Sequence, residues 1–101
     1  MTSTDATEPL NDSDAITLAR HSNVRNLVSL SICRSNITKT GALALSQSTN
    51  FPCLEQYVID RKALGDLTTA QFSDQIVFKD TLKRLIVLTY EPEFNQEIIN
   101  F

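Results

Sequence analysis

Apolar residues recur along the chain in one spacing that appears three times. The pattern L-x-x-φ-x-φ, in which φ is an apolar residue, occupies residues 27–32, 54–59 and 82–87, so its copies start 27 and 28 residues apart. In each copy the last two of these apolar positions lie two residues apart, and alternate side chains of a strand point to the same face. The sequence therefore predicts three short strands, each with one buried face.

Three segments have helical character: one lies before the first strand, one after the first strand and one after the second. Each begins near a residue type that caps helices. Asp14 precedes AITLARH, Thr40 and Gly41 precede ALALSQ, and Asp66 precedes LTTAQFSDQI. Asp and Thr side chains accept hydrogen bonds from the first free amides of a helix. Parallel strands need a crossover of a dozen or more residues, which these segments supply. We expect parallel strands near 27–32, 54–59 and 82–88, and helices near 14–22, 41–49 and 67–78 on the opposite side.

The constant period divides the chain into units that must stack. One unit cannot bury both its strand face and its helix, so neighbouring units form a continuous core. We expect a flexible polar segment at 1–13 and one α/β domain at 14–101, built of a half unit, two full units, a terminal strand and a C-terminal segment. The predicted core comprises Leu27, Leu30, Ile32, Ile37, Leu43, Leu45, Phe51, Leu54, Tyr57, Ile59, Leu64, Phe72, Ile76, Phe78, Leu82, Leu85 and Val87.

The first full unit, NLVSLSICRSNIT followed by KTGALALSQ, resembles the leucine-rich repeat family, specifically its ribonuclease-inhibitor-like subtype. That subtype pairs L-x-x-L-x-L-x-x-N-x-φ with a following G-A-x-A-L helix. The ninth position, asparagine in the family, is Ser35, Lys62 and Tyr90 in the three units. The resemblance covers about residues 10–88 and implies a short solenoid with parallel strands on one face and helices on the other. A doubly wound sheet is the alternative, but its glycine-rich phosphate loop is absent from the sequence.

Composition and charge narrow the classes of partner. The chain is 42% apolar and 21% charged, as in an ordinary globular domain. Its net charge of −3 argues against nucleic acid, because phosphate binding needs a basic face. The sequence has no run of about 18 apolar residues that could span a bilayer, and residues 1–14 lack the charged-then-apolar pattern of a secretion signal. We therefore expect a cytoplasmic protein with no membrane partner.

Candidate catalytic and metal-binding chemistry is sparse. The sequence contains no G-x-S-x-G, H-E-x-x-H, P-loop or C-x-x-C motif. Cys33 and Cys53 lack a metal-site spacing and are expected to be free thiols, buried by default, although the strand register places Cys33 on the inner face. His21 has no neighbouring ligand or nucleophile and is expected to be a surface residue. We therefore expect a non-catalytic protein without a cofactor or metal.

The residues between the core positions form three columns on the exposed strand face, which the resemblance makes the concave face. The columns are Ser29, Gln56 and Arg84; Ser31, Val58 and Ile86; and Cys33, Asp60 and Leu88. An apolar patch rimmed by charge is typical of a partner-binding site. The predicted partner-binding residues are Gln56, Val58, Asp60, Arg61, Arg84, Ile86 and Leu88. In the alternative, the chain's own C-terminal segment, with Phe94, Ile98, Ile99 and Phe101, covers this end of the core.

Three kinds of function fit these observations. The first is a protein–protein interaction module that binds a protein partner through its strand face. The second, which the resemblance brings in, is a regulatory accessory domain of the GTPase-activating or ubiquitin-ligase substrate-recognition type. The third is a structural fragment completed by self-association. Fold alone does not decide among these three kinds of function. The residues on the strand face are therefore needed to choose between them.

Overall fold

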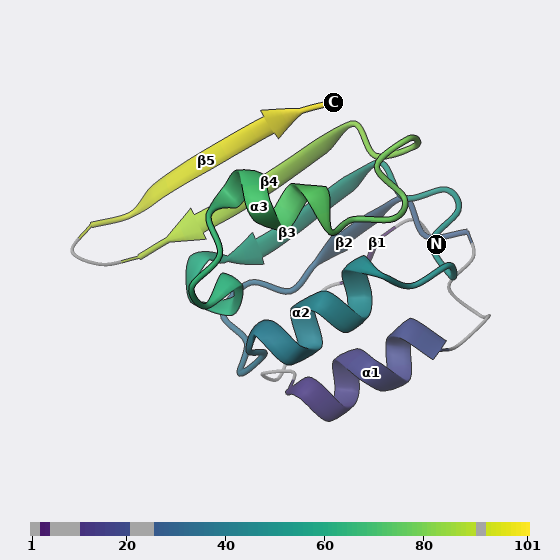
Figure 1. Cartoon of the computed structure of the whole chain (residues 1–101), viewed down its shortest axis with the longest axis horizontal. Helices are drawn as coiled ribbons and strands as arrows, with labels where there is room; N and C mark the ends of the chain where they lie inside the picture. Colours follow the sequence, from purple (N-terminus) through teal and green to yellow (C-terminus); the bar gives the residue numbers. More distant parts are fainter. Residues whose placement is uncertain (1–2, 5–10, 21–25, 91–92) are drawn as a thin grey trace.

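The computed structural model describes residues 3–4, 11–20, 26–90 and 93–101 and has an α/β architecture (Figure 1). One sheet contains, in spatial order, β1 (Ser3–Thr4), β2 (Ser29–Ser31), β3 (Gln56–Asp60), β4 (Arg84–Thr89) and β5 (Asn95–Asn100). β1 to β4 are parallel to one another, and β5 is antiparallel to β4. The helices are α1 (Asp12–Arg20), α2 (Lys39–Ser46), the 3-10 helix η2 (Arg61–Leu64) and α3 (Thr69–Asp74).

The register of the parallel strands confirms the register predicted from the spacing. Ser29 in β2 lies opposite Gln56 in β3, which lies opposite Arg84 in β4. Two residues further on, Val58 lies between Ser31 and Ile86 in the same way. Equivalent positions of successive units are therefore neighbours in the sheet.

The helices α1, α2 and α3 lie on one side of the sheet (Figure 1). Leu30, Tyr57 and Leu85, which align across the three strands, are fully buried on that side. Their strand neighbours point the other way. We call the side opposite the helices the open face, because no helix of the described part of the chain covers it. The sheet is neither curled nor closed, so the open face is not the concave groove that the resemblance implies.

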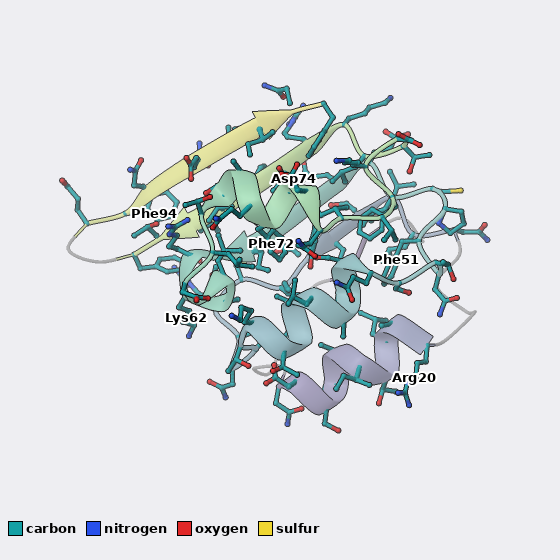
Figure 2. The ribbon with its side chains drawn as sticks, viewed as in Figure 1. Arg20, Phe51, Lys62, Phe72, Asp74 and Phe94 are labelled. Carbon is teal, nitrogen blue, oxygen red and sulfur yellow. The ribbon has the colours of Figure 1, made fainter. Side chains whose placement is uncertain are left out.

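The core lies between the helices and the sheet and centres on Tyr57. The Tyr57 ring packs against Phe72 and Phe78, at centroid distances of 6.1 and 6.0 Å. Its hydroxyl lies 3.3 Å from the Ser46 hydroxyl, so the buried phenol has a polar partner. Figure 2 shows Phe72 in this interior, whereas Phe94 lies at the periphery. Every predicted core residue is buried except Leu43, which packs against the core while partly exposed.

Three helix starts differ from the predicted ones by a few residues. Asn11 caps α1: its side chain accepts from the Asp14 amide at 2.9 Å, while Asp14 accepts from the Asn11 amide at 3.1 Å. α2 begins after Thr38 rather than after Thr40. α3 begins after Thr68, which forms a capping box with Gln71, so Asp66 is not its cap. For α1 and α3 the capping residue forms local hydrogen bonds with the first turn, whereas the Thr38 side chain makes no capping bond to α2.

The ends of the chain contain elements that the hydrophobic pattern did not predict. Ser3–Thr4, within the segment expected to be flexible, pairs with β2 as β1. The C-terminal segment pairs with β4 as β5, and its Ile99 packs against the core, as the alternative expected, whereas Phe94, Ile98 and Phe101 stay exposed. α3 ends at Asp74, so the helix expected over 67–78 is shorter than predicted. The predicted surface residue His21 lies outside the described residues.

Candidate functional site

The central row of the open face is apolar across three adjoining strands. The row consists of Ser31, Val58, Ile86 and Ile98, each aligned with the next across the sheet. Val58 and Ile86 are partly buried, and Ile98 is 45% exposed. The sequence predicted Val58 and Ile86 together here, but it did not predict that β5 would add Ile98 beside them.

The row at the amino ends of the strands is polar. Gln56 donates from Nε2 to the Ser29 hydroxyl at 3.5 Å, and Arg84 donates from Nη1 to Gln56 Oε1 at 3.4 Å. Both hydrogen bonds are long and join partly or fully exposed side chains, so they are weak and fix the side chains of this row only slightly. Gln56 and Arg84 are therefore free to exchange these bonds for others.

A pocket of about 650 Å³ lies at the carboxyl ends of β2, β3 and β4. It is formed by equivalent positions of the three units, because the pocket occupies the turn that leaves each strand. Its lining residues are Arg34, Ser35, Asn36, Asp60, Arg61, Lys62, Leu88, Thr89 and Tyr90. The carboxyl ends of parallel strands are a common place for ligands in open α/β sheets.

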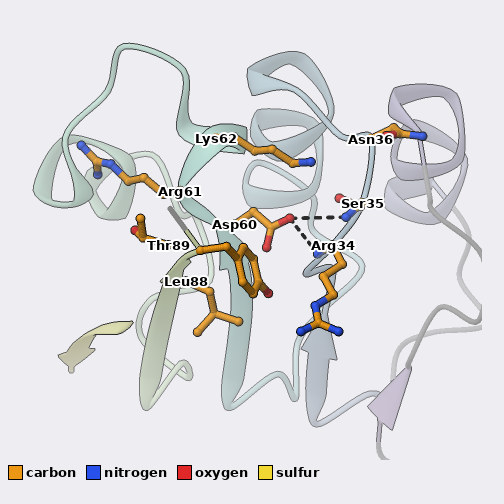
Figure 3. Close-up of a pocket in the computed structure, with 9 residues that line it drawn as sticks. Arg34, Ser35, Asn36, Asp60, Arg61, Lys62, Leu88 and Thr89 are labelled. Carbon is orange, nitrogen blue, oxygen red and sulfur yellow. Dashed lines mark hydrogen bonds between the residues drawn. The ribbon is translucent and has the colours of Figure 1, made fainter. Parts of the chain in front are cut away.

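Asp60 is buried at the base of this pocket, which corrects its predicted place on the exposed face. Only 1% of Asp60 is exposed. Its Oδ2 atom accepts hydrogen bonds from the backbone amides of Arg34 at 2.7 Å and Ser35 at 3.3 Å (Figure 3). Arg34 has a positive φ of 56°, a left-handed conformation that turns both amides toward one carboxylate. Asp60 thus fastens the β2 turn to β3.

The second oxygen of Asp60 has no hydrogen-bond partner among the described residues. Buried polar atoms are usually paired, so Oδ1 is an acceptor that lacks a donor. Lys62 extends its ammonium group over the Asp60 side of the pocket in Figure 3. Arg61 instead turns away from Asp60 and donates to the Thr69 hydroxyl at 3.1 Å. Arg61 was predicted to flank the apolar patch, but this bond directs its guanidinium toward α3.

Arg34 and Tyr90 close one side of the pocket together. The guanidinium carbon of Arg34 lies 5.3 Å from the centre of the Tyr90 ring, a cation–π contact. The Tyr90 ring also packs against Phe94 at 5.7 Å. Burial, followed by the negative charge of Asp60, raises the pKa of the Tyr90 hydroxyl above its usual value. Tyr90 therefore remains a neutral hydroxyl at physiological pH and can donate a hydrogen bond.

Metal-binding clusters and thiols are the remaining chemical features to place among the described residues. No cluster of His, Cys, Asp and Glu in residues 3–4, 11–20, 26–90 and 93–101 could hold a metal ion. Within the same ranges, no helix has both the length and the apolar character needed to cross a membrane. Cys33 and Cys53 are free thiols; Cys53 is exposed, so the prediction that it is buried was wrong. Cys33 is partly buried, 3.3 Å from the Ser31 hydroxyl.

The structure divides the predicted partner-binding residues into groups. Val58, Ile86 and Leu88 share the open face; Gln56 and Arg84 lie at one end of it, and Asp60, Arg61 and Leu88 line the pocket at the other.

The sequence prediction missed Arg34, Lys62, Tyr90 and Ile98. Ser35, Lys62 and Tyr90 are the three residues at the ninth position of the units, where the repeat pattern has asparagine. Because none of these three residues is asparagine, the ninth position was the feature of the sequence that could have indicated the pocket.

No family model, no curated protein and no solved structure matches this chain.

Proposed function

We propose that the chain is a short leucine-rich-repeat-like solenoid that acts as a non-catalytic interaction module and binds a protein partner through its open face. The 27- and 28-residue steps, which match residue for residue across β2, β3 and β4, support the repeat architecture. Each unit places its helix or its η2–α3 segment on the same side of the sheet. The open face, on the opposite side of the sheet, is therefore the surface proposed to bind the partner.

The observation that carries this proposal is the apolar row of Val58, Ile86 and Ile98. Strands with one face on a core usually present polar residues on the other face. Here three aliphatic side chains adjoin one another across β3, β4 and β5, and Ile98 is 45% exposed. A polar row with Gln56 and Arg84 borders them, as a polar rim borders the apolar centre of an interface.

The pocket at the carboxyl ends of the strands provides an anchor next to this row. Leu88 continues the open face into the pocket and is aligned with Asp60 across β4 and β3 (Figure 3). A partner N–H or O–H donor satisfies the unpaired Oδ1 atom of Asp60 once the side chains that bury this atom move aside. Arg34 and Lys62 attract acidic groups at the rim. This combination of donor, acceptor and apolar surface suits a protein partner.

Charge and chemistry favour a protein over the other partner classes. A net charge of −3 opposes binding along a nucleic-acid backbone. The described residues supply no metal cluster, and Asp60 is engaged with the Arg34 and Ser35 amides instead of a reacting group. The module is therefore expected to position a partner without transforming it.

The experiment is a pull-down from native cell extract that compares the wild-type chain with an Ile86→Asp variant. A buried interface excludes an unpaired charge, so this substitution should abolish capture of the partner. The far-UV circular dichroism and the melting temperature should stay nearly unchanged, because Ile86 faces away from the core. Combining it with Arg84→Glu should remove any residual binding.

Val77→Asp is the matched control for this experiment. Val77 is 55% exposed in the segment between α3 and β4, so the variant adds the same charge at an apolar residue outside the open face. It should bind like the wild type. If both variants bind normally, the open face is not the binding surface. If Ile86→Asp unfolds the chain, Ile86 belongs to the core and the proposal loses its main support.

A further inference from the structure

β5 forms an edge of the sheet, and its outer side is unpaired within the described part of the chain. Unpaired strand edges pair readily with other strands, and proteins usually protect them with lysine, proline, bulges or covering segments. The strand NQEIIN contains no lysine and no proline. Its one charged residue, Glu97, is aligned with Val87 and accepts a hydrogen bond from Thr69 of α3, so it does not guard the edge.

The hydrogen bonds of β4 determine which groups of β5 point outward. Arg84 donates its amide to Glu55 on the β3 side, whereas Lys83 accepts the amide of Phe101 on the β5 side. In an antiparallel pair the residues that bond across alternate, so Phe101, Ile99 and Glu97 turn their backbone groups toward β4. The N–H and C=O groups of the residues between them point outward. These residues are Gln96, Ile98 and Asn100.

We propose that two copies of this chain pair antiparallel through β5, about a two-fold axis at Ile98, to form one continuous sheet. This interface is separate from the proposed function, because it uses the backbone edge of the sheet and a second copy of the chain. In this register Ile98 bonds to Ile98 of the second copy, and Gln96 bonds to Asn100 of the second copy. Every outward N–H and C=O of these three residues then has a partner.

A two-fold axis could also be centred on another residue of β5, but the residues of the strand favour the register centred on Ile98. A shift that centres the axis on Glu97 places two like charges opposite each other, which destabilises a sheet. A shift that centres it on Ile99 leaves the outward groups of Gln96 beyond the end of the second copy's β5. The axis at Ile98 avoids both costs. Glu97 then faces Ile99 of the second copy, and the amide side chains of Gln96 and Asn100 lie side by side.

The side chains around the axis also gain from the pairing. Ile98, 45% exposed in one copy, meets Ile98 of the second copy, so the apolar row continues from one open face to the other. Phe101, 47% exposed, comes beside Asn95 of the second copy, next to its 62% exposed Phe94.

Disulfide trapping of the purified chain tests this interface without any other protein present. Cys33 and Cys53 are first replaced by serine, and an Ile98→Cys variant is then oxidised. Directly opposed residues of a hydrogen-bonded antiparallel pair have Cα atoms about 5.5 Å apart, within the range of a disulfide. The variant should form a covalent dimer in high yield. Gln96→Cys should not link to itself, but it should link to Asn100→Cys when the two variants are mixed.

Val77→Cys supplies the background of random collision, because Val77 is exposed and lies outside β5. Sedimentation of the chain without new cysteines should show a dimer between about 1 µM and about 1 mM, the range of weak affinities. Ile98→Lys, which opposes two positive charges at the axis, should raise the dissociation constant at least tenfold while circular dichroism stays unchanged. A chain that is monomeric at every concentration, or equal cross-linking by Val77→Cys and Ile98→Cys, would overturn the proposal.

Discussion

Asp12 in α1 holds the first turn of α2, with its Oδ1 atom 3.1 Å from the backbone nitrogen of Gly41. The same carboxylate accepts the Thr38 amide at 2.8 Å and the Thr38 hydroxyl at 2.6 Å. Thr38 is the N-terminal cap residue of α2, but its own side chain does not cap the helix. Asp12 performs that role from the neighbouring unit, where its negative charge also favours the positive end of the helix.

Acid should therefore weaken the contact between the first two helices. The hydrogen bond from the Thr38 hydroxyl, followed by that from the Thr38 amide, lowers the pKa of the Asp12 carboxyl below its usual value. A pKa that is lower in the folded state gives stability that is present above the unfolded pKa and is lost as the pH falls through the folded pKa. Urea unfolding from about pH 5 to about pH 2 should show a smaller loss of stability for Asp12→Asn than for the wild type. Parallel curves for the two proteins would contradict this role of Asp12.

Gly41→Ala should destabilise the protein, although alanine is the better helix former by about 1 kcal/mol. A Cβ atom at Gly41 would lie 2.5 Å from Asp12 Oδ1, 3.0 Å from the Ile37 side chain and 3.1 Å from that of Ala15. Two of these neighbours belong to α1, so the helices would have to separate, at a cost of about 1–3 kcal/mol. Thermal melts should show a lower midpoint. Adding Asp12→Ala should then cost less than it does in the wild type, because the two positions are coupled.

The facing of β2 can be tested with two adjacent substitutions. Leu30 is fully buried toward the helices, so Leu30→Ala should cost about 2–5 kcal/mol of unfolding free energy. Ser29 lies on the open face and is partly exposed, with one weak bond from Gln56, so Ser29→Ala should stay within about 0.5 kcal/mol. Urea melts of the two variants decide the matter. A larger loss for Ser29→Ala would mean that the strand faces the other way.

The sequence predicted the parallel strands well because a constant period restricts how they align. If units repeat every 27 or 28 residues and stack, equivalent residues must become neighbours, as Leu30, Tyr57 and Leu85 do. The core followed from the same spacing. β5 could not be predicted in this way, because NQEIIN has no clear alternation of apolar and polar residues and is mostly exposed on both faces. Only the free edge of β4 gives it a partner.

The burial of Asp60 in the candidate site could not be predicted from the alternation of apolar and polar residues. Alternation correctly places the Asp60 side chain on the side away from the helices, but alternation says nothing of what lies above it. The turn after β2, with Arg34 at a positive φ, folds over Asp60 and buries it. The apolar row, in contrast, depends only on register, and its Val58 and Ile86 were predicted together.

Replacing Asp60 should separate its structural role from its role as an acceptor in the pocket. Asp60→Ala leaves the amides of Arg34 and Ser35 without a partner in a buried place, which should cost about 1–3 kcal/mol per unpaired group. Asp60→Asn keeps an oxygen for these amides and replaces the unpaired Oδ1 atom with a donor, so it should lose less stability. The same variant should nevertheless weaken the binding of any partner that donates a hydrogen bond to Oδ1.

Asp74→Ala serves as the control, because Asp74 is an exposed residue of α3 with only a 3.8 Å contact to Lys79. It should change neither the stability of the chain nor the binding of the partner. Urea unfolding measures the stability order, in which Asp60→Ala should be the lowest. If Asp60→Asn proves more damaging than Asp60→Ala, the bonds from Asp60 to the β2 turn are not what holds that turn in place.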